Sequence, residues 1–357
     1  MPLPFRPPTH PHDHTLELVA LSLTPFSRRR DLGERLRAAH DPASILDRVL
    51  ARRPAEAGLD RPTLLARASL AISRAADRGV HLVAWGAASY PAALSVLVDP
   101  PPVLWIRGNP DALVGRAVAI VGSRAGSEYG LAVAERLAAD LAGRDIVVVS
   151  GLARGIDSAA HRGALTANGT TVAVLGCGAD VIYPSEHRDL ARRIESRGAI
   201  VSELVPGTPP QKQFFPLRNR IISGLSRAVL IVEAGEKSGS LITARCALEQ
   251  GREVLAVPGN VLSGRNRGGH ALLKDGAKIV ESADDILEEL GMPSAGTCRA
   301  IEPEDAVLAG LPAGEPCDLD MLAERTGLAS TRLLPRLFEL ELAGLVRRVG
   351  GGRFARV

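Results

Sequence analysis

The residues whose types and spacing best suit chemistry lie between positions 214 and 240. Arg218 and Arg220 follow the aromatic pair at 214–215, and further along the chain Ser238-Gly239-Ser240 opens a stretch with helical spacing. Guanidinium groups beside aromatic rings bind the phosphates and stack on the bases of nucleic acids. Backbone N–H groups and hydroxyls at a helix N-terminus also suit phosphate. A pair of solvated surface arginines is the alternative for Arg218 and Arg220 taken alone.

Three more loops place glycine and arginine where buried strands are expected to end. Their residues of interest are Gly122, Ser123, Arg124, Gly151, Arg154, Gly155 and Gly176. Glycine lets a backbone approach a ligand closely, and arginine supplies a forked cation. Because the carboxyl ends of parallel strands meet at one edge of a sheet, we expect these loops to share a rim with the 214–240 segment.

No pattern typical of an enzyme accompanies these loops. The segment 151–157 lacks the full GxGxxG spacing, and neither a P-loop lysine motif nor a GxSxG elbow occurs. Asp157, His161, Glu203 and Glu233 are candidate acids or bases, but none pairs in sequence with a nucleophile, a metal cluster or a second carboxylate. Structural roles are favoured for all four. The sequence therefore predicts a binding protein with no catalytic residue, metal or cofactor.

Alternating strands and helices must position these loops. Apolar, β-branched runs predict strands, and helical spacing starts at Tyr129, Ile156, His187 and Leu241. The predicted strands cover 117–121, 146–150, 171–175, 200–203, 228–234 and 254–257, preceded by strand-like segments at 81–85 and 103–108. This alternation predicts an α/β fold with an extended Rossmann-like, doubly wound parallel sheet.

Composition and spacing divide the 357 residues into several parts. We expect a disordered proline-rich tail at 1–14, a small all-helical domain at 15–80, the Rossmann domain at 81–290, a linker at 291–303 and a winged-helix domain at 304–357. The net charge is only +3, so a polyanion site requires local clustering of cations. The four cysteines form no CxxC pair, and no run of apolar residues is long enough to span a membrane. A cytoplasmic location without membrane attachment is expected.

The motifs together resemble the DNA-processing protein A (Smf) family. They read VAIVGSRAGSEYG, VVVSGLARGIDSAAHRGAL, YPSEH, IVSEL, FFPLRNRIISGLS, IVEAGEKSGSLITARCALEQG, VLAVPGN and LLKDGAKIV, in order, from about Tyr90 to Leu290. The resemblance implies a protein that binds single-stranded DNA and promotes RecA loading in natural transformation and recombination. It also implies a helix-hairpin-helix-like (SAM) N-terminal domain and a single-strand-binding protein as a further partner.

The resemblance places a basic DNA pocket at the strand-end loops. The implied DNA-binding residues are Gly122, Ser123, Arg124, Gly151, Arg154, Gly155, Gly176, Phe215, Arg218, Asn219, Arg220, Lys237, Ser238, Gly239 and Ser240. One departure stands at Ser185 and Glu186, where similar proteins often carry a lysine after the YP pair. Arg188 is the candidate substitute for that lysine.

A homodimer is expected at the end of the sheet, where the apolar content is high. The predicted interface residues are His270, Leu272, Leu273 and Val280. Similarity to family members that dimerise near here also favours it. Packing of these side chains within one chain is the alternative.

The C-terminal segment resembles the winged-helix domain that some family members carry. Helices at 318–326 and 330–343 precede two strands around Gly350–Gly352, and Asp318 is expected to cap the first helix. Arg347 and Arg348 are basic, but Asp320 and other carboxylates offset them, so duplex binding and protein docking both stay open. Two other functions compete with single-strand binding: a Rossmann-type enzyme acting on nucleotides and a duplex-binding winged-helix regulator.

Overall fold

The computed structural model describes residues 14–28, 31–51, 59–292, 305–312, 316–342, 345–349 and 352–356. The chain falls into two compact units, one within Met1–Met292 and the other within Pro293–Val357. The predicted tail up to residue 13 and the predicted linker from residue 293 onward lie outside the described residues. Among those that are described, no helix is both long enough and apolar enough to cross a lipid bilayer.

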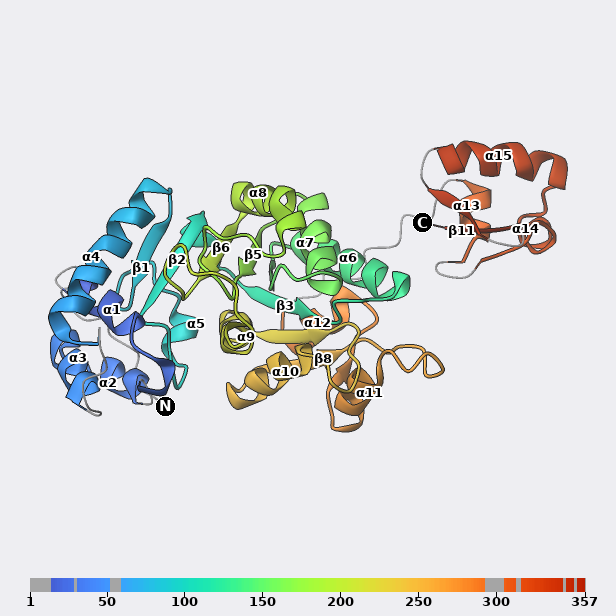
Figure 1. The fold of residues 1–357 in the computed structure, drawn as a ribbon. Helices are drawn as coiled ribbons and strands as arrows, with labels where there is room; N and C mark the ends of the chain where they lie inside the picture. Colours follow the sequence, from blue (N-terminus) through green and yellow to red (C-terminus); the bar gives the residue numbers. More distant parts are fainter. Residues whose placement is uncertain are drawn as a thin grey trace. The chain divides into compact units, whose positions relative to one another are not determined.

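A nine-stranded sheet forms the centre of the first unit (Figure 1). Its strands are β1 His81–Ala84, β2 Val103–Gly108, β3 Ala117–Val121, β4 Val147–Ser150, β5 Thr171–Val174, β6 Ala199–Ser202, β7 Ala228–Ile231, β8 Glu253–Ala256 and β9 Lys278–Ile279. They lie in the order β1-β2-β6-β5-β4-β3-β7-β8-β9. The pairs β1–β2 and β2–β6 are antiparallel, and the other pairs are parallel. The predicted Rossmann-like sheet is confirmed, with an antiparallel extension at one edge.

The strand order creates a switch point beside β3. This strand pairs with β4 on one side, where Ala119 lies opposite Val149, and with β7 on the other, where Ala119 lies opposite Val229. After β3, the next strands β4, β5 and β6 are added one after another on one side of it. The later strands β7, β8 and β9 are added on its other side. The crevice at the carboxyl ends of β3 and β7 is where sheets of this kind bind ligands.

Helices cover both faces of this sheet (Figure 1). They are α6 Glu128–Ala142, α7 Ile156–Thr166, α8 Arg188–Arg197, α9 Phe214–Leu225, α10 Ser240–Glu249, α11 Arg267–Lys274 and α12 Ala283–Glu289. Val118 and Ile120 of β3 pack in one core with α6 and α7, whereas Ala119 and Val121 pack in the other with α9 and α10. This alternation of side chains is the period of two expected for a strand that is buried on both faces.

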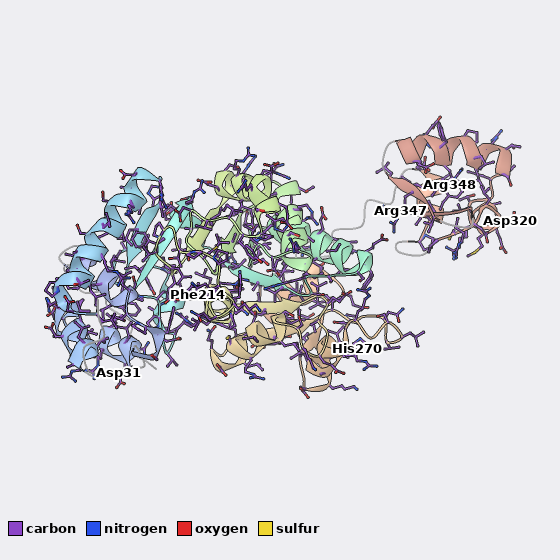
Figure 2. The ribbon with its side chains drawn as sticks, in the orientation of Figure 1. Asp31, Phe214, His270, Asp320, Arg347 and Arg348 are labelled. Carbon is purple, nitrogen blue, oxygen red and sulfur yellow. The ribbon has the colours of Figure 1, made fainter. Side chains whose placement is uncertain are left out.

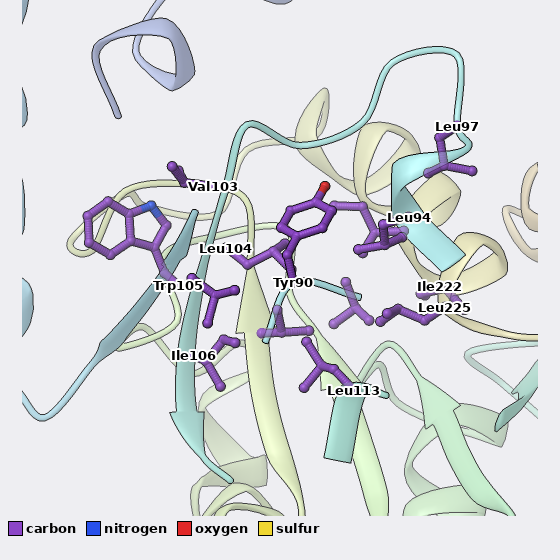
Figure 3. Packing of buried hydrophobic residues seen from close by; sticks show 14 of the residues in the cluster. Tyr90, Leu94, Leu97, Val103, Leu104, Trp105, Ile106, Leu113, Ile222 and Leu225 are labelled. Carbon is purple, nitrogen blue, oxygen red and sulfur yellow. The ribbon is translucent and has the colours of Figure 1, made fainter. Parts of the chain in front are cut away.

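The N-terminal helices share the core on the α9 side. They are α1 Thr15–Ser22, α2 Leu32–Arg37, α3 Pro42–Ala51 and α4 Arg61–Asp77, with α5 Ala92–Ser95 following β1. Leu46 and Leu64 belong to the same hydrophobic cluster as Trp105 of β2. Figure 3 shows the continuation of this cluster, in which residues of β2 and α5 pack near Ile222 and Leu225 of α9.

The second unit contains three helices and a hairpin in its described residues. They are α13 Ala306–Gly310, α14 Leu319–Thr326, α15 Ser330–Leu342, β10 Val346–Val349 and β11 Arg353–Arg356. Asp318 caps α14, because its carboxylate accepts a hydrogen bond from the Met321 N–H. Of the glycines predicted to form the wing, 350 and 351 lie outside the described residues. The winged-helix fold expected from the sequence is confirmed.

The last helix of this winged-helix unit, α15, is not strongly basic toward solvent. Arg336 forms ion pairs with Asp305 and Glu339, while Leu334 and Phe338 are exposed, the latter to 60%. Arg347 and Arg348 lie on β10 (Figure 2), and the Arg348 guanidinium lies over the Phe354 ring, 5.3 Å from its centroid. Duplex binding and protein docking by this unit both remain predictions.

Candidate nucleic-acid interface

A cavity of about 810 Å³ opens at the carboxyl ends of β3, β4 and β7. Its wall combines the loop after β3, the start of α7, the turn before α10 and one side of α9. The lining residues include Gly122, Ser123, Arg124, Ala125, Ala153, Asp157, Tyr183, Lys212, Phe215, Arg218, Asn219, Lys237, Ser238, Gly239 and Ser240. This is the crevice predicted by the strand order.

Glycines let the loops around this cavity pack tightly. The Ser123 N–H donates to the Glu233 carbonyl at 2.7 Å, and the Ile156 N–H donates to the Ser123 carbonyl at 3.2 Å. Gly155 has a φ of 76°, and a Cβ at this position would lie 2.3 Å from the Ser123 carbonyl oxygen. Only glycine fits there, because both the backbone conformation and the space exclude a side chain. The loops after β3, β4 and β7 are therefore held together as one rim.

Aromatic and cationic side chains meet at the mouth of the cavity. The exposed Arg124 guanidinium lies 5.4 Å from the centroid of the Phe215 ring, and the Tyr183 and Phe215 ring centroids are 5.7 Å apart. Lys212 and Lys237 are exposed and also line the wall. Such a mixture of ring faces and mobile cations suits the bases and phosphates of an unpaired nucleic-acid strand.

Phe215 has room for its ring because Gly176 lies beneath it. A Cβ on Gly176 would be 3.0 Å from the Phe215 Cδ1 atom. Gly176 does not itself belong to the cavity wall. Its predicted place in the binding site is thus indirect, as a support for the ring. Phe214, next to Phe215 and labelled in Figure 2, instead lines a small pocket with Phe26, Leu217 and other residues.

Arg218 forms the floor of the cavity and ties two strand ends together. Its Nη1 atom donates to the Gly151 carbonyl at 2.7 Å and to the Val174 carbonyl, and its Nε atom donates to Asn219 Oδ1 at 3.1 Å. Gly151 must lack a side chain, since a Cβ there would lie 2.2 Å from this guanidinium. Burial lowers the pKa of Arg218, and the Asp157 charge opposes this effect. The side chain therefore serves the structure while adding positive charge to the floor.

The turn before α10 presents hydroxyls and open backbone to the cavity. The Oγ atoms of Ser238 and Ser240 are 2.7 Å apart, and nothing lies within 4 Å of a Cβ built on Gly239. Asn219 Nδ2 lies 3.4 Å from the Gly239 carbonyl and fixes the turn against α9. The N-terminus of a ten-residue helix thus faces the cavity, as the sequence predicts for a phosphate site.

The acid and base candidates from the sequence all have structural partners. Burial raises the pKa of Asp157, whereas the Arg218 charge and the N–H groups of Ala153 and Gly151 oppose this rise. Burial, helped by the charges of His187 and other groups, lowers the pKa of His161 to about 3, so this ring stays neutral and accepts or donates at Thr171 Oγ1, 2.7 Å away. Among the described residues, no group of three or more His, Cys, Asp or Glu side chains could hold a metal ion.

The two glutamates end strands, as expected, and each is bound in place. Glu233 follows β7 and accepts hydrogen bonds from the N–H and the hydroxyl of Ser127, the residue that caps α6. Glu203 follows β6 and accepts two hydrogen bonds from Arg220. Glu233 thus holds the residue that caps α6, and Glu203 holds Arg220 of α9. These contacts position neighbouring helices.

Arg220 requires a correction, because the structure places it away from the cavity. Its Nη2 atom donates to both carboxylate oxygens of Glu203 at 2.7 and 2.6 Å, and its Nε atom lies 3.1 Å from Asp99 Oδ2. Burial would lower the pKa of Arg220, but the charges of Glu203 and Asp99 outweigh it and the pKa is raised. Arg220 is 7% exposed and is therefore removed from the set of candidate DNA-binding residues.

Arg154 lies at the rim outside the cavity wall. Its exposed guanidinium donates to Glu186, which follows the YP pair and Ser185. This hydrogen bond raises the pKa of Arg154 and lowers that of Glu186. The departure noted in the sequence thus has a structural consequence, since Glu186 neutralises one of the predicted cations.

Among the wall residues that the sequence prediction of DNA contacts missed, two carry a side chain suited to a phosphate or a base. Lys212 precedes Phe215 in the segment QKQFFP, and Tyr183 lies in the segment YPSEH. Both stand inside motifs that the prediction used, so their types and positions gave a signal. The prediction weighed arginines and glycines more heavily than a lone lysine or tyrosine.

The predicted dimer residues also need one correction. Val280 is fully buried in the core formed with α6 and α12 and has no surface to offer a partner. Leu272 and Leu273 are half-buried against the other core, and the His270 ring lies 3.0 Å from the Gly259 carbonyl (Figure 2). The neighbouring Ile279 of β9 is 53% exposed.

The sheet order and the cavity at its switch point define a Rossmann-type α/β unit, followed along the chain by a winged-helix unit. Residues 81–291 match the family model described as DNA recombination-mediator protein A, and residues 297–352 match the model of the DprA winged helix domain. The first match alone spans more than half of the chain. The chain therefore belongs to the DNA-processing protein A (DprA/Smf) family.

Individual relatives agree with this assignment. Protein Smf of Escherichia coli (strain K12) is 43% identical over 286 residues, which cover 76% of each chain. DNA processing protein DprA of Streptococcus pneumoniae is 47% identical over 200 residues, covering 56% of this chain and 71% of the relative. The X-ray structure of DprA from Streptococcus pneumoniae has a TM-score of 0.62 at 36% identity and covers 77% of this chain and 93% of that one.

A second solved structure concerns a ligand. The DprA structure from Helicobacter pylori has a TM-score of 0.54 at 30% identity and covers 60% of this chain and 97% of that chain. That structure concerns the single-stranded DNA binding mode of the Helicobacter pylori protein.

Proposed function

We propose that this protein binds single-stranded DNA in the cavity between β3, β4 and β7. The observation that carries the proposal is the Arg124, Phe215 and Tyr183 cluster at the mouth of a cavity whose wall also holds Lys212 and Lys237. Stacking on exposed rings requires bases that are unpaired, which favours a single strand over a duplex. The Helicobacter pylori relative, described as a single-strand binder, supports the same ligand class.

The proposed contact set combines predicted residues with those added by the structure. It comprises Gly122, Ser123, Arg124, Tyr183, Lys212, Phe215, Arg218, Asn219, Lys237, Ser238, Gly239 and Ser240. Exposed cations bind the phosphates, the rings stack on bases, and the turn before α10 offers N–H groups and hydroxyls to one phosphate.

The salt dependence of binding tests this proposal. For single strands the logarithm of the binding constant falls with the logarithm of salt concentration by about 0.7 per neutralised phosphate. Arg124→Ala and Lys237→Ala should each flatten this slope by roughly one contact, measured by fluorescence anisotropy with an oligothymidylate. The exposed Arg67 of α4 gives a matched control, because Arg67→Ala removes the same charge away from the cavity. Slopes that are equal in all four proteins would place the DNA elsewhere.

We further propose that the bound strand is handed to RecA during recombination and natural transformation, in the cytoplasm and without any chemical reaction. The family description as a recombination mediator supports this role. RecA cannot nucleate easily on a strand coated by single-strand-binding protein, so a mediator should shorten the lag in RecA ATP hydrolysis on coated DNA. The parent protein should shorten this lag, and Arg124→Ala should not. An unchanged lag with the parent protein would contradict the RecA proposal while leaving DNA binding intact.

The homodimer is a further part of the proposal. β9 is an edge strand with an exposed Ile279, and Leu273 of the preceding helix α11 is half-buried, so an apolar contact between two copies would cover this edge. Two DNA sites in one particle would then raise the avidity for long strands. Sedimentation of the intact protein should report a dimer, and Leu273→Arg should yield a folded monomer. If the parent protein sediments as a monomer at micromolar concentration, the proposed homodimer is wrong.

A further inference from the structure

A second cavity lies next to the first, beside α8. It has a volume of about 410 Å³, and its wall contains Val181, Ile182, Arg188, Arg192, Arg107, Asp180 and Glu195. Val181 and Ile182 directly precede Tyr183, which lines the larger cavity. One short loop therefore separates the two cavities, with Tyr183 on one side and the two aliphatic residues on the other.

The exposed surface of α8 is rich in arginine. Arg188, Arg192, Arg193 and Arg197 all face solvent, while Ala191 and Ile194 face the core. Arg192 pairs with Asp189, but Arg188 and Arg193 pair with no carboxylate among the described residues. Cations that are exposed and unpaired are available to a polyanion, and the fold gives no other use for them.

The Arg154–Glu186 ion pair stands where a strand would leave the larger cavity for this surface. Arg154 follows β4 beside the wall residue Ala153, and Glu186 lies between Tyr183 and the start of α8. The two side chains are 64% and 48% exposed. A pair this exposed is weak, so a phosphate can replace Glu186 as the partner of Arg154.

We infer that a single strand longer than the first cavity continues past Tyr183 and lays its phosphodiester backbone along α8. The inference rests on the proposed function and extends it. A cavity of about 810 Å³ is the size of a small-molecule site and holds a few nucleotides at most, so a long strand has to leave it. The route over Tyr183 offers it Arg154 and then Arg188 and Arg192, which are four residues apart on one face of α8 and both line the second cavity. The Arg192–Asp189 pair is at least as exposed as the Arg154–Glu186 pair, so a phosphate can replace Asp189 in the same way. Glu186 is then the residue that weakens this second segment.

Strand length separates the two segments in an experiment. The probes are oligothymidylates of about 5 and about 25 nucleotides, which bracket the usual site sizes of single-strand binders. Arg188→Ala/Arg192→Ala should weaken binding of the long probe by roughly 3- to 20-fold at moderate salt and flatten its salt slope by about 1.4. This double variant should bind the short probe as tightly as the parent does. Both residues are exposed, so the fold should be unaffected, which thermal unfolding verifies.

Two further variants complete the test. Arg67→Ala/Arg74→Ala removes two exposed arginines from α4 and should leave both probes unaffected. Glu186→Gln removes the competing carboxylate and should tighten binding of the long probe alone by roughly 2- to 5-fold. By contrast, Arg124→Ala should weaken both probes, because it lies in the first cavity.

Several outcomes would overturn the inference. A long probe that binds Arg188→Ala/Arg192→Ala as tightly as the parent excludes α8 from the path, as does an equal loss for both probe lengths. If Arg124→Ala still weakens both probes in that case, the first cavity stands and only the extension fails. If the parent binds neither probe, the proposed function and the extension fail together.

Discussion

Arg220→Met is expected to lower the free energy of unfolding by roughly 3–5 kcal/mol, the usual cost of removing one partner from a buried ion pair. Arg220 and Glu203 are 7% and 5% exposed, and the arginine donates to both carboxylate oxygens. Methionine has a similar length but no charge, so Glu203 would keep a buried negative charge without its cation. The pair also joins α9 to the end of β6, so the change should disturb the packing that supports the cavity floor.

Urea unfolding at neutral pH measures this effect, with two comparisons. Arg220→Met/Glu203→Leu should recover part of the stability, because an apolar pair can replace a buried ion pair. Arg67→Ala, an exposed arginine on α4, should change the free energy of unfolding by less than about 0.5 kcal/mol. If Arg220→Met unfolds at the same urea concentration as the parent but loses DNA affinity, Arg220 belongs to the binding surface after all.

The different fates of Arg218 and Arg220 follow from helix geometry. Both lie on α9, and residues two positions apart on a helix point about 200° apart. One side chain therefore reaches the strand ends at the cavity floor, while the other reaches Glu203 on the opposite side. The Arg-Asn-Arg motif predicts that both arginines bind DNA only when the two side chains are assumed to point the same way. The helical period would have separated them, once the segment was recognised as a helix.

The central strands were predictable because their sequences are apolar and β-branched over four or five residues. The strands β3 and β4 show this clearly, as all of their residues are buried. The partners of β1 and β2 were not predictable, since an apolar run does not specify which strand it pairs with or in which direction. The antiparallel pairing of β2 with β6 depends on packing between segments that are far apart in sequence.

Apolar content alone could not distinguish a core from an interface. Val280 was assigned to a dimer surface, but it is fully buried against α6 and α12 within the chain. The resemblance drew attention to Ser185 and Glu186, where a lysine was expected after the YP pair. The sequence could not show that Glu186 would pair with Arg154, because 32 residues separate them. The domain boundaries drawn from composition remain predictions, since the N-terminal helices share a core with the sheet.

Phe215→Ala is expected to weaken the binding of single-stranded DNA by about 1–3 kcal/mol, or roughly 5- to 150-fold, the usual cost of losing a stacking ring. The ring is half-buried, lies 5.4 Å from the Arg124 guanidinium and 5.7 Å from the Tyr183 ring, and has Gly176 beneath it. Removing it would take away the stacking surface and also the support that orients Arg124.

The matched variants for this change keep or move the aromatic ring. Phe215→Tyr retains a ring of the same shape and should bind within about threefold of the parent. Tyr129→Ala removes a ring of α6 that is 55% exposed and does not line this cavity. This variant should bind single-stranded DNA as tightly as the parent does. Thermal unfolding of each variant separates a loss of binding from a loss of fold.

The affinity of the parent, Phe215→Ala, Phe215→Tyr and Tyr129→Ala for a fluorescent oligothymidylate, with the corresponding duplex as competitor, tests the central claim most directly. We expect the parent to bind the single strand tightly and the duplex to compete poorly. Phe215→Ala should lose affinity, whereas Phe215→Tyr and Tyr129→Ala should bind nearly as tightly as the parent. A folded Phe215→Ala protein that binds the single strand as tightly as the parent would contradict the assignment of this cavity as the DNA site.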